Sequence, residues 1–303
     1  MKQARKISRR KATACMAVGC ALLLQTSLAF AAAEAAETAS TNLDQVVVTA
    51  NRIPSRLSEA AANVAVVTRE EIEKKNYSTV IDVLKDVNGV AITSQGFAGA
   101  EQHALLNGDQ RVVIMVDGRR LNFNKLAGNY ERATYDLNAL PMLDNVERIE
   151  ILKGAGSAQY GSDAVGGVIN IITRAGKQNR TTLDINQGSW GTGNYSLTTE
   201  GSQKDWSWFV AAGKSHQNSF SYKNYRTGEV VKMPNSAFDK NNLTIRLDKK
   251  INADSSLTFN FEHVDDHKGQ PWGAISSFKS DDYLNSLSNN VAITYNYKQK
   301  TEL

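Results

Sequence analysis

The sequence predicts an α+β domain followed by the wall of a transmembrane antiparallel β-barrel. Residues 63–176 combine short apolar runs, typical of buried strands, with apolar residues at helical spacing. Residues 180–297 instead alternate apolar and polar side chains in short stretches, several of which end in aromatic residues. Brief turns alternate with long connections between these stretches, which is the usual pattern of an outer-membrane barrel.

The first 31 residues differ in charge from the rest of the chain. They hold six basic side chains and no acidic one, whereas the whole chain has 35 basic and 31 acidic residues. The remainder is therefore slightly acidic, which disfavours a general nucleic-acid-binding protein. Both cysteines, Cys15 and Cys20, also lie in this segment, so the rest of the chain has no disulfide, thiolate metal site or catalytic cysteine.

The same segment has the layout of a secretory signal peptide. A basic stretch precedes an apolar stretch over residues 12–30, and Ala29-Phe30-Ala31 gives a small-x-small cleavage pattern. An uncleaved membrane anchor is the alternative, because about 20 apolar residues can span a bilayer. We expect residues 1–31 to be removed and the protein to be exported.

A valine run follows a small, polar and acidic spacer at residues 32–45. Val46, Val47 and Val48 have strong strand preference, but no partner strand is obvious nearby. Such a run is most often a core strand. Its position beside a flexible spacer also fits a strand that is offered to another protein.

Local signals within residues 63–176 predict individual elements. Thr68 and Glu71 have the spacing of a helix-capping box. A second helix should present one apolar face and end at Asn88-Gly89; that face comprises Val80, Val83, Leu84 and Val87. Apolar runs predict strands at 63–67, 112–116, 146–152 and 168–172.

The segment 153–167 contains five glycines but does not match a nucleotide-binding loop. No Lys-Ser or Lys-Thr pair follows any of them, and the third glycine of a dinucleotide fingerprint would fall on Gln159. Tight turns and close backbone packing explain these glycines better.

The alternation beyond residue 180 leaves one structural alternative. An antiparallel sandwich of a secreted protein would show the same pattern, because alternation does not distinguish lipid from a protein core. The long connections expected in this region span residues 217–239 and 265–288.

Three motifs, taken in order, resemble the TonB-dependent outer-membrane receptors, and most closely those for cobalamin and siderophores. The first resembles a TonB box and comprises Asp44, Gln45, Val46, Val47, Val48, Thr49 and Ala50. The second, at residues 113–122, resembles the central strand and turn of the plug domain, and the third, at residues 145–173, resembles its end. Asn107-Gly108 departs from the Arg-Gly step that the family usually has before the central strand.

The resemblance implies a domain organisation. Residues 1–31 would be the signal peptide, 32–52 a flexible spacer with the TonB box, 53–176 the α+β plug domain, and 177–303 a partial barrel of about six strands. Because the plugged transporters have roughly 22 strands, the barrel is expected to be incomplete and the chain to be an N-terminal fragment.

The resemblance also implies function. It predicts energised uptake of a metal chelate (a siderophore, haem or cobalamin) across the outer membrane of a Gram-negative-type cell. The expected partners are a TonB-type energy-transducing protein, which pairs with the box by strand addition, the chelate, and outer-membrane lipid, with no nucleic acid and no cofactor. A non-transporting surface or porin-like protein is the alternative.

Ligand contacts are expected in two plug loops, at residues 94–103 and 122–132, by position against the family. The candidates offer ring, amide and cationic groups: Phe97, Gln102, Asn124, Lys125, Asn129, Tyr130 and Arg132.

Metal binding and catalysis have weaker support. His263 and His267 are four residues apart in a predicted strand end, which separates them too widely for zinc. Calcium is a weak possibility at the loop carboxylates Asp265, Asp266, Asp281 and Asp282. No nucleophile–base arrangement is visible, so we do not expect an enzyme.

Overall fold

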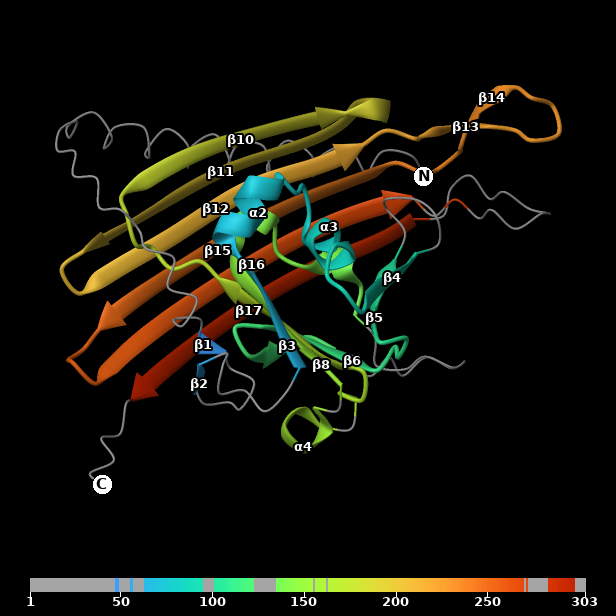
Figure 1. Ribbon diagram of the computed structural model, residues 1–303. Helices are drawn as coiled ribbons and strands as arrows, with labels where there is room; N and C mark the ends of the chain where they lie inside the picture. Colours follow the sequence, from blue (N-terminus) through green and yellow to red (C-terminus); the bar gives the residue numbers. More distant parts are fainter. Residues whose placement is uncertain are drawn as a thin grey trace, which may run out of the picture. The chain divides into compact units, whose positions relative to one another are not determined.

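The structure is a computed structural model that describes two main sheets. It covers residues 47–48, 55–56, 63–94, 101–122, 135–154, 156–161, 163–269, 271 and 283–297. A five-stranded sheet has the order β3-β8-β9-β6-β7, and a six-stranded sheet has the order β10-β11-β12-β15-β16-β17 (Figure 1). No helix among the described residues is long and apolar enough to cross a membrane.

The five-stranded sheet and its helices form the α+β domain. Its strands are β3 (Asn63–Thr68), β6 (Val112–Val116), β7 (Arg119–Arg120), β8 (Val146–Lys153) and β9 (Gly167–Thr173). β6 and β9 run parallel, and the other pairs are antiparallel. A separate hairpin pairs β4 (Val90–Ser94) with β5 (Gln102–Leu106). The helical elements are α2 (Arg69–Lys75), α3 (Val80–Lys85), η3 (Leu137–Ala139), η4 (Leu143–Asn145) and α4 (Ser157–Tyr160).

The predicted capping box at the start of α2 is confirmed. Glu71 N donates to Thr68 Oγ1, and Thr68 N donates to Glu71 Oε2 at 2.9 Å. The prediction for α3 was wrong at its end, since the helix stops at Lys85 and Asp86 caps it. Gly89 does have the left-handed φ of +79°, but it shapes the turn into β4 rather than the helix terminus.

The core of the α+β domain lies between its sheet and the helices α2 and α3. Leu84, Leu106, Val146, Ile149 and Ile171 are fully buried there. Every residue of this core belongs to segments between Ala65 and Ile171. The domain therefore buries its own apolar side chains and does not need the second sheet to do so.

Glycines in segment 153–167 allow close backbone approach, as predicted. Gly167 has a φ of +142°, and a Cβ atom there would lie 2.0 Å from the carbonyl oxygen of Leu152. A Cβ atom added at Gly166 would lie 2.9 Å from the carbonyl oxygen of Asp109. These contacts bring β9 against β8 and the turn before β6.

The six-stranded sheet is a continuous antiparallel array of long strands. Its members are β10 (Arg180–Gly188), β11 (Thr192–Gln203), β12 (Trp206–Gln217), β15 (Phe238–Lys250), β16 (Ser255–Gly269) and β17 (Tyr283–Tyr297). A one-turn element, η5 (Ser189–Gly191), joins β10 to β11, and a small hairpin of β13 (Ser221–Lys223) and β14 (Val230–Lys232) lies between β12 and β15.

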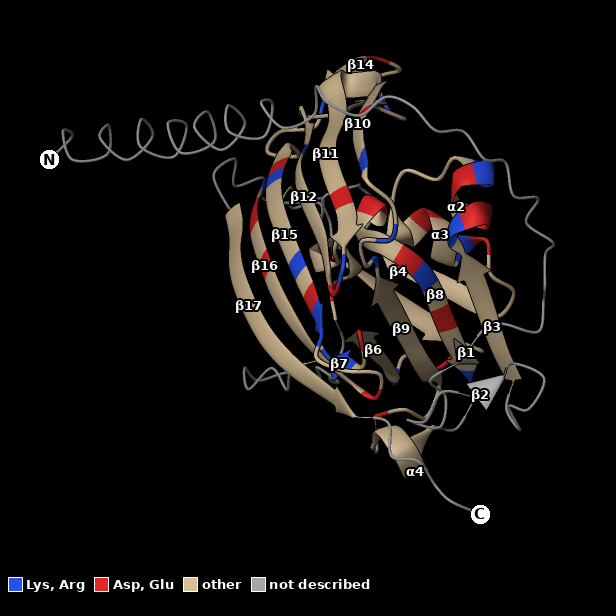
Figure 2. Ribbon diagram, turned by 90° about the vertical axis from the view of Figure 1, so that its left-hand side faces the viewer, with Lys and Arg blue, Asp and Glu red and all other residues tan. Residues whose placement is uncertain are grey.

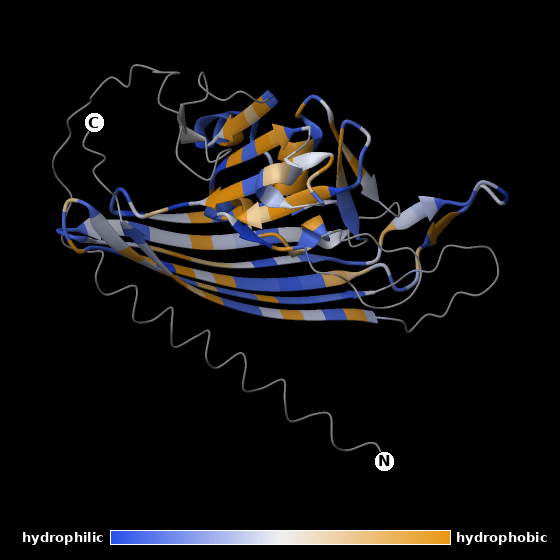
Figure 3. Ribbon diagram, turned by 90° about the horizontal axis from the view of Figure 1, so that it is seen from below, coloured by the Kyte–Doolittle hydropathy of each residue, from blue (hydrophilic) through white to orange (hydrophobic). Residues whose placement is uncertain are grey.

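The register of this sheet separates an apolar face from a polar face. Val210, Ile245, Phe261 and Val291 lie opposite one another across four strands. Exposed apolar side chains share that outer face, namely Leu183, Ile185, Leu247, Leu257 and Ile293. The alternation of apolar and polar residues along the strands is visible in Figure 3.

The opposite, inner face carries buried polar side chains and lies against the α+β domain. Its buried polar residues include Ser196, Thr198, Glu200, Asn242, Thr244, Thr258, Asp266 and Lys268. Charged residues interrupt β11, β15 and β16 in Figure 2. A sheet that is apolar outside and polar inside has the pattern of a barrel wall rather than of a sandwich.

The last long connection is shorter than predicted. We expected residues 265–288 to form it, but β16 extends to Gly269 and β17 begins at Tyr283. The ladder continues because residues 265–269 pair in register with residues 283–287. Polar composition alone therefore misplaced both strand ends, since the inner face of this sheet is itself polar.

Candidate functional site

The candidate functional site is the polar interface between the α+β domain and the inner face of the six-stranded sheet. Four groups of charged residues cross it. Each group pairs side chains from the ends of strands or helical turns of the domain with residues that point inward from the sheet.

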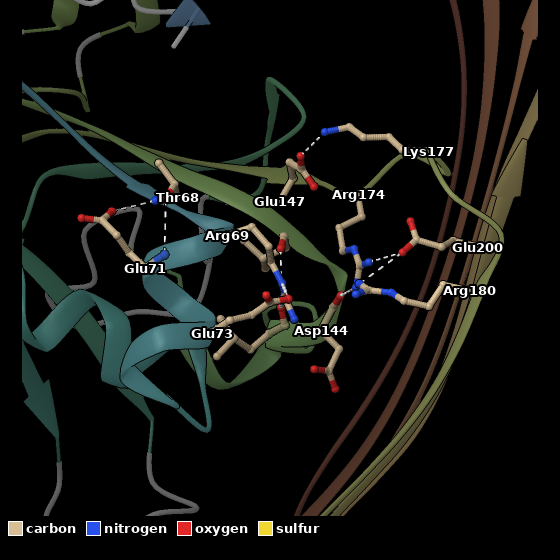
Figure 4. Close-up of polar contacts among 12 residues, drawn as sticks. Thr68, Arg69, Glu71, Glu73, Asp144, Glu147, Arg174, Lys177, Arg180 and Glu200 are labelled. Carbon is tan, nitrogen blue, oxygen red and sulfur yellow. Dashed lines mark hydrogen bonds and ion pairs between the residues drawn. The ribbon is translucent and has the colours of Figure 1, made fainter. Parts of the chain in front are cut away.

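The first group surrounds Arg174, which follows β9 directly. Its guanidinium forms an ion pair with Glu200 of β11 and donates to Asp144 O at 3.3 Å (Figure 4). Phe209 of β12 packs against it, with the guanidinium carbon 5.2 Å from the ring centroid. Burial lowers the pKa of Arg174, and Glu200 opposes this shift. A cation enclosed in this way needs its carboxylate partner.

The neighbouring turn η4 makes hydrogen bonds with the same sheet. Asn145 is buried, and its Nδ2 donates to Thr244 Oγ1 of β15 at 2.7 Å. Ser196 of β11 donates to the Asp144 carboxylate. The backbone N–H of Arg174 donates to Asn145 O at 2.8 Å, so η4 and the exit of β9 are held together.

The second group is built on the turn after β6. Asp117 has a positive φ of 49°, and its carboxylate accepts from both the N–H and the hydroxyl of Thr173, at 2.9 and 2.6 Å. Arg246 of β15 donates to Thr173 Oγ1 at 3.0 Å and lies 3.8 Å from Asp117. Asp248 holds Arg246 from its own strand at 2.9 Å.

The third group joins β7 to the last two strands of the six-stranded sheet. Arg119 pairs with Glu262 of β16 at 2.9 Å and donates to Asn290 of β17 at 3.3 Å. These residues line a small cavity of about 50 Å³ next to Asp117.

The fourth group holds η3. Lys268 of β16 pairs with Asp136 at 2.8 Å and lies 3.5 Å from Asp266. Lys240 of β15 donates to the carbonyl oxygens of Asn138 and Leu140 at 2.5 and 3.0 Å. Two lysines on adjacent strands therefore bind this helical turn: Lys268 pairs with Asp136 at its start, and Lys240 binds carbonyl oxygens toward its end.

A cavity of about 580 Å³ lies beside this fourth group. Elements of both the α+β domain and the sheet line it, including α2, α3 and η3 on one side and β10, β11 and β15 on the other. Gln102, Lys240 and Lys268 are among the lining residues.

The structure describes few of the predicted site residues. Val47 and Val48 of the candidate TonB box form the short strand β1 (Val47–Val48), which pairs with β2 (Ser55–Arg56). The box residues Asp44, Gln45, Val46, Thr49 and Ala50 lie outside the described residues.

Among the predicted ligand contacts, Gln102 is described. It is the first residue of β5, is 8% exposed, and its N–H donates to Asp136 Oδ1 at 3.1 Å. The remaining candidates lie outside the described residues: Phe97, Asn124, Lys125, Asn129, Tyr130 and Arg132.

The weak calcium candidates do not gather into one site among the described residues. Asp265 and Asp266 are consecutive in β16 and so point to opposite faces, and Asp281 and Asp282 are outside the described residues. His263 and His267 each contact an asparagine of β17, Asn289 and Asn285. The described part of the chain brings no three His, Cys, Asp or Glu side chains together as a metal would require.

Apart from Asp266, which was a weak calcium candidate, the charged residues of the interface were not predicted as a site. In their local sequence, the cations of the interface look like ordinary polar residues; they are Arg119, Arg174, Lys240 and Lys268. One signal was available for the sheet residues, because Lys240, Arg246, Asp266 and Lys268 share the even-numbered, polar parity of their strands. Only the fold shows which residues of the α+β domain pair with them.

The sequence matches known proteins across both parts of the chain. Residues 56–168 match the family described as TonB-dependent Receptor Plug Domain. The chain is 31% identical over 246 residues to the iron-regulated outer membrane virulence protein of Vibrio cholerae. The matched region covers 78% of this chain and 36% of that protein. The chain therefore spans about a third of the length of the curated relatives that it matches.

Solved structures share the fold. The chain is similar to the ferric yersiniabactin uptake receptor FyuA from Yersinia pestis, with a TM-score of 0.61 and 17% identity, over 80% of this chain and 39% of that chain. It is also similar to the ferripyoverdine receptor of the outer membrane of Pseudomonas aeruginosa, with a TM-score of 0.60 and 17% identity, over 82% of this chain and 33% of that chain. At these identities the similarity shows the fold of the α+β domain and of the strands beside it.

Proposed function

We propose that this chain is part of a TonB-dependent receptor and takes part in energised uptake of a ferric siderophore. Residues 56–168 match the plug-domain family, and the strands that follow share the fold of part of a receptor barrel. The observation that carries the proposal is the polar interface described above. A plug with its own core is held against a polar inner wall by hydrogen bonds and ion pairs, whereas the outer face of that wall is apolar. Such a plug can shift without exposing its core.

The iron-regulated relative supports a ferric chelate over the cobalamin that the sequence also suggested. The relative is an outer membrane protein of Vibrio cholerae, and its name records regulation by iron. Two receptors with the same fold have names that specify ferric yersiniabactin and ferripyoverdine. We therefore propose a siderophore as the substrate class, bound by loops of the plug near Gln102.

The energy source in this proposal is a TonB-type protein that pairs with Asp44–Ala50. A strand added to the valine run would gain backbone hydrogen bonds and make few demands on side chains. Val47 and Val48 already adopt a paired strand, which supports their competence for this contact.

Export in this proposal depends on residues 1–31 as a signal peptide. Mass spectrometry of the mature protein should find an N-terminus between residues 32 and 36. An intact leader in the steady-state protein would contradict export by cleavage.

Uptake by the complete receptor tests the proposed function. A strain that lacks the gene should lose growth and radioactive iron uptake on one ferric siderophore under iron limitation, and should recover both when the gene is restored. A strain without TonB should bind the same chelate and fail to take it up. Unchanged siderophore uptake together with lost cobalamin uptake would move the substrate class to cobalamin, and loss of neither would favour a non-transporting surface protein.

A further inference from the structure

Asp136 occupies a junction between three parts of the molecule. Its Oδ1 accepts from the N–H of Gln102 and from the N–H of Asn138, each at 3.1 Å. Its Oδ2 accepts from Lys268 at 2.8 Å. One carboxylate therefore ties the start of β5, the start of η3 and the end of β16 to each other.

The lysine that Asp136 meets is held in an enclosed and electrically balanced group. The Lys268 side chain is 3% exposed. Asp266 is its second acidic neighbour, and Lys240 lies directly opposite Asp266 in the strand register. Two cations and one anion on β15 and β16 are thus gathered with Asp136 of the α+β domain, so removing one charge leaves an uncompensated charge in a buried place.

The same group fixes both ends of η3. Asp136 caps the N–H of Asn138 at its start, and Lys240 binds the carbonyl oxygens of Asn138 and Leu140 toward its other end. An acid at the start and a lysine at the end of a helical turn both match its dipole. The turn consequently has one position against the sheet.

The group also lies where strand ends of the six-stranded sheet meet. Lys268 is the penultimate residue of β16 and pairs with Phe238, the first residue of β15. Gly269 N donates to Ala237 O at 2.9 Å, just before β15. Gln102, which is the described candidate for ligand binding, is tied to this corner through the backbone contact with Asp136.

We propose that Asp136 and Lys268 form a positioning pair, which sets β5 and η3 of the plug against the wall and thereby sets the affinity for the ligand. The effect on ligand affinity rests on the proposed function. The mechanical part, which is the placement of β5 and η3 by the pair, does not. Neither side chain needs to touch the chelate. Lys268 acts on Gln102 through Asp136, and the pair lines or adjoins the 580 Å³ cavity without filling it.

Hydrogen exchange in the complete receptor tests the mechanical part. Lys268→Met keeps the apolar stem and removes the charge. It should speed amide exchange in peptides that cover residues 101–106 and 135–140 by about tenfold, as expected for loss of a charged hydrogen bond. Lys214→Met is the matched control, because Lys214 pairs with Asp239 at 2.7 Å between β12 and β15 and has the strand parity of Val210, on the outer face of the sheet. Equal exchange in Lys268→Met and Lys214→Met would overturn the proposal.

Asp136→Asn is a second variant, which changes the other member of the pair. Asparagine keeps an Oδ1 acceptor for the amides of Gln102 and Asn138 and loses only the charge that faces Lys268. In a double-mutant cycle, adding Lys268→Met to Asp136→Asn should have less effect on exchange than it has in the parent protein. Additive effects would mean that the two residues do not act as a pair.

Ligand affinity tests the functional part, with ferric yersiniabactin, ferripyoverdine and ferric enterobactin as probes. For any probe that the parent receptor binds, both single variants should raise Kd about tenfold, whereas Lys214→Met should leave it unchanged. An unchanged Kd alongside faster exchange would overturn the link to affinity. If the parent receptor binds none of the three probes, that result would count against the proposed substrate class. The exchange data would still decide the role of the pair.

Discussion

At the residue scale, charged side chains hold the interface together, whereas apolar side chains hold the core of the α+β domain together. Arg119, Arg174, Lys240 and Lys268 each meet a partner across it. Buried ion pairs add little net stability, yet the loss of one partner is costly. The contacts are therefore specific about position without binding the plug to the wall irreversibly.

Gly167 is the residue whose substitution should damage the plug most directly. Gly167→Ala would place a Cβ atom 2.0 Å from Leu152 O at a φ of +142°, so β8 and β9 must separate. We expect a loss of at least about 3 kcal/mol in the free energy of unfolding. Urea unfolding of residues 53–176, whose core is self-contained, measures it.

Gly118→Ala is the control for this effect. Gly118 also has a positive φ, of +77°, but no described residue other than its chain neighbours comes within 4 Å of its added Cβ. Its cost should be only that of the left-handed backbone, about 1 kcal/mol. Equal losses in the two variants would show that close approach of β8 to β9 is not the cause.

His103 should make the stability of the plug depend on pH. Glu101 raises the pKa of His103, the carbonyl of Tyr135 adds to the shift, and burial opposes it. A pKa that is higher in the folded state favours folding when the histidine is protonated. This stabilisation is complete below the unfolded value of about 6.5 and is lost as the pH rises through the folded value.

Two measurements check the histidine. An NMR titration should show a pKa for His103 above its ordinary value, and Glu101→Gln should lower it. In urea unfolding, His103→Gln should remove part of the decrease in stability between pH 6 and pH 8. A titration of His103 below its ordinary value would contradict the assigned role of Glu101.

At the element scale, the sequence predicted those features of helices and strands that depend on residues close together in the chain. The capping box at Thr68 and the strand at 112–116 depend on neighbouring residues, and both are present. The end of α3 and the extension of β16 to Gly269 depend on packing and on cross-strand partners, and both were misplaced. The positioning pair could not be predicted, because Asp136 and Lys268 are 132 residues apart and only the fold brings them together.

The outer face of the six-stranded sheet should tolerate charge according to depth. Ile245 lies mid-strand on the apolar face, between Val210 and Phe261. If this face contacts lipid, Ile245→Arg should cost about 2–4 kcal/mol, whereas Leu257→Arg, near a short turn, should cost less than about 1 kcal/mol. The yield of folded complete receptor, seen as heat-modifiable migration on gels, measures both. Equal yields would indicate that the face does not lie in a membrane.

At the scale of the whole molecule, the two parts of the chain are stabilised by different means. The plug has an apolar core of its own, and the wall presents a polar face to it. The ion pairs across the interface add little net stability, because each charge gives up its contacts with water to form them. A force applied to the plug can therefore move it while the wall stays intact, provided that the force enters through a segment joined to the plug.

In the proposed mechanism that segment is the candidate TonB box at Asp44–Ala50, and proline tests this proposal. In the complete receptor, Val47→Pro should abolish uptake of the ferric siderophore and leave its binding unchanged. Proline removes one backbone donor and fixes φ near −65°, so a strand added at this place loses a ladder hydrogen bond and the pairing beside it. Val47→Ala keeps the backbone intact and should reduce uptake far less. Radioactive iron uptake and equilibrium binding on the same cells separate the two steps. Normal uptake with proline, or equal loss with alanine, would show that strand addition at this segment does not energise the receptor.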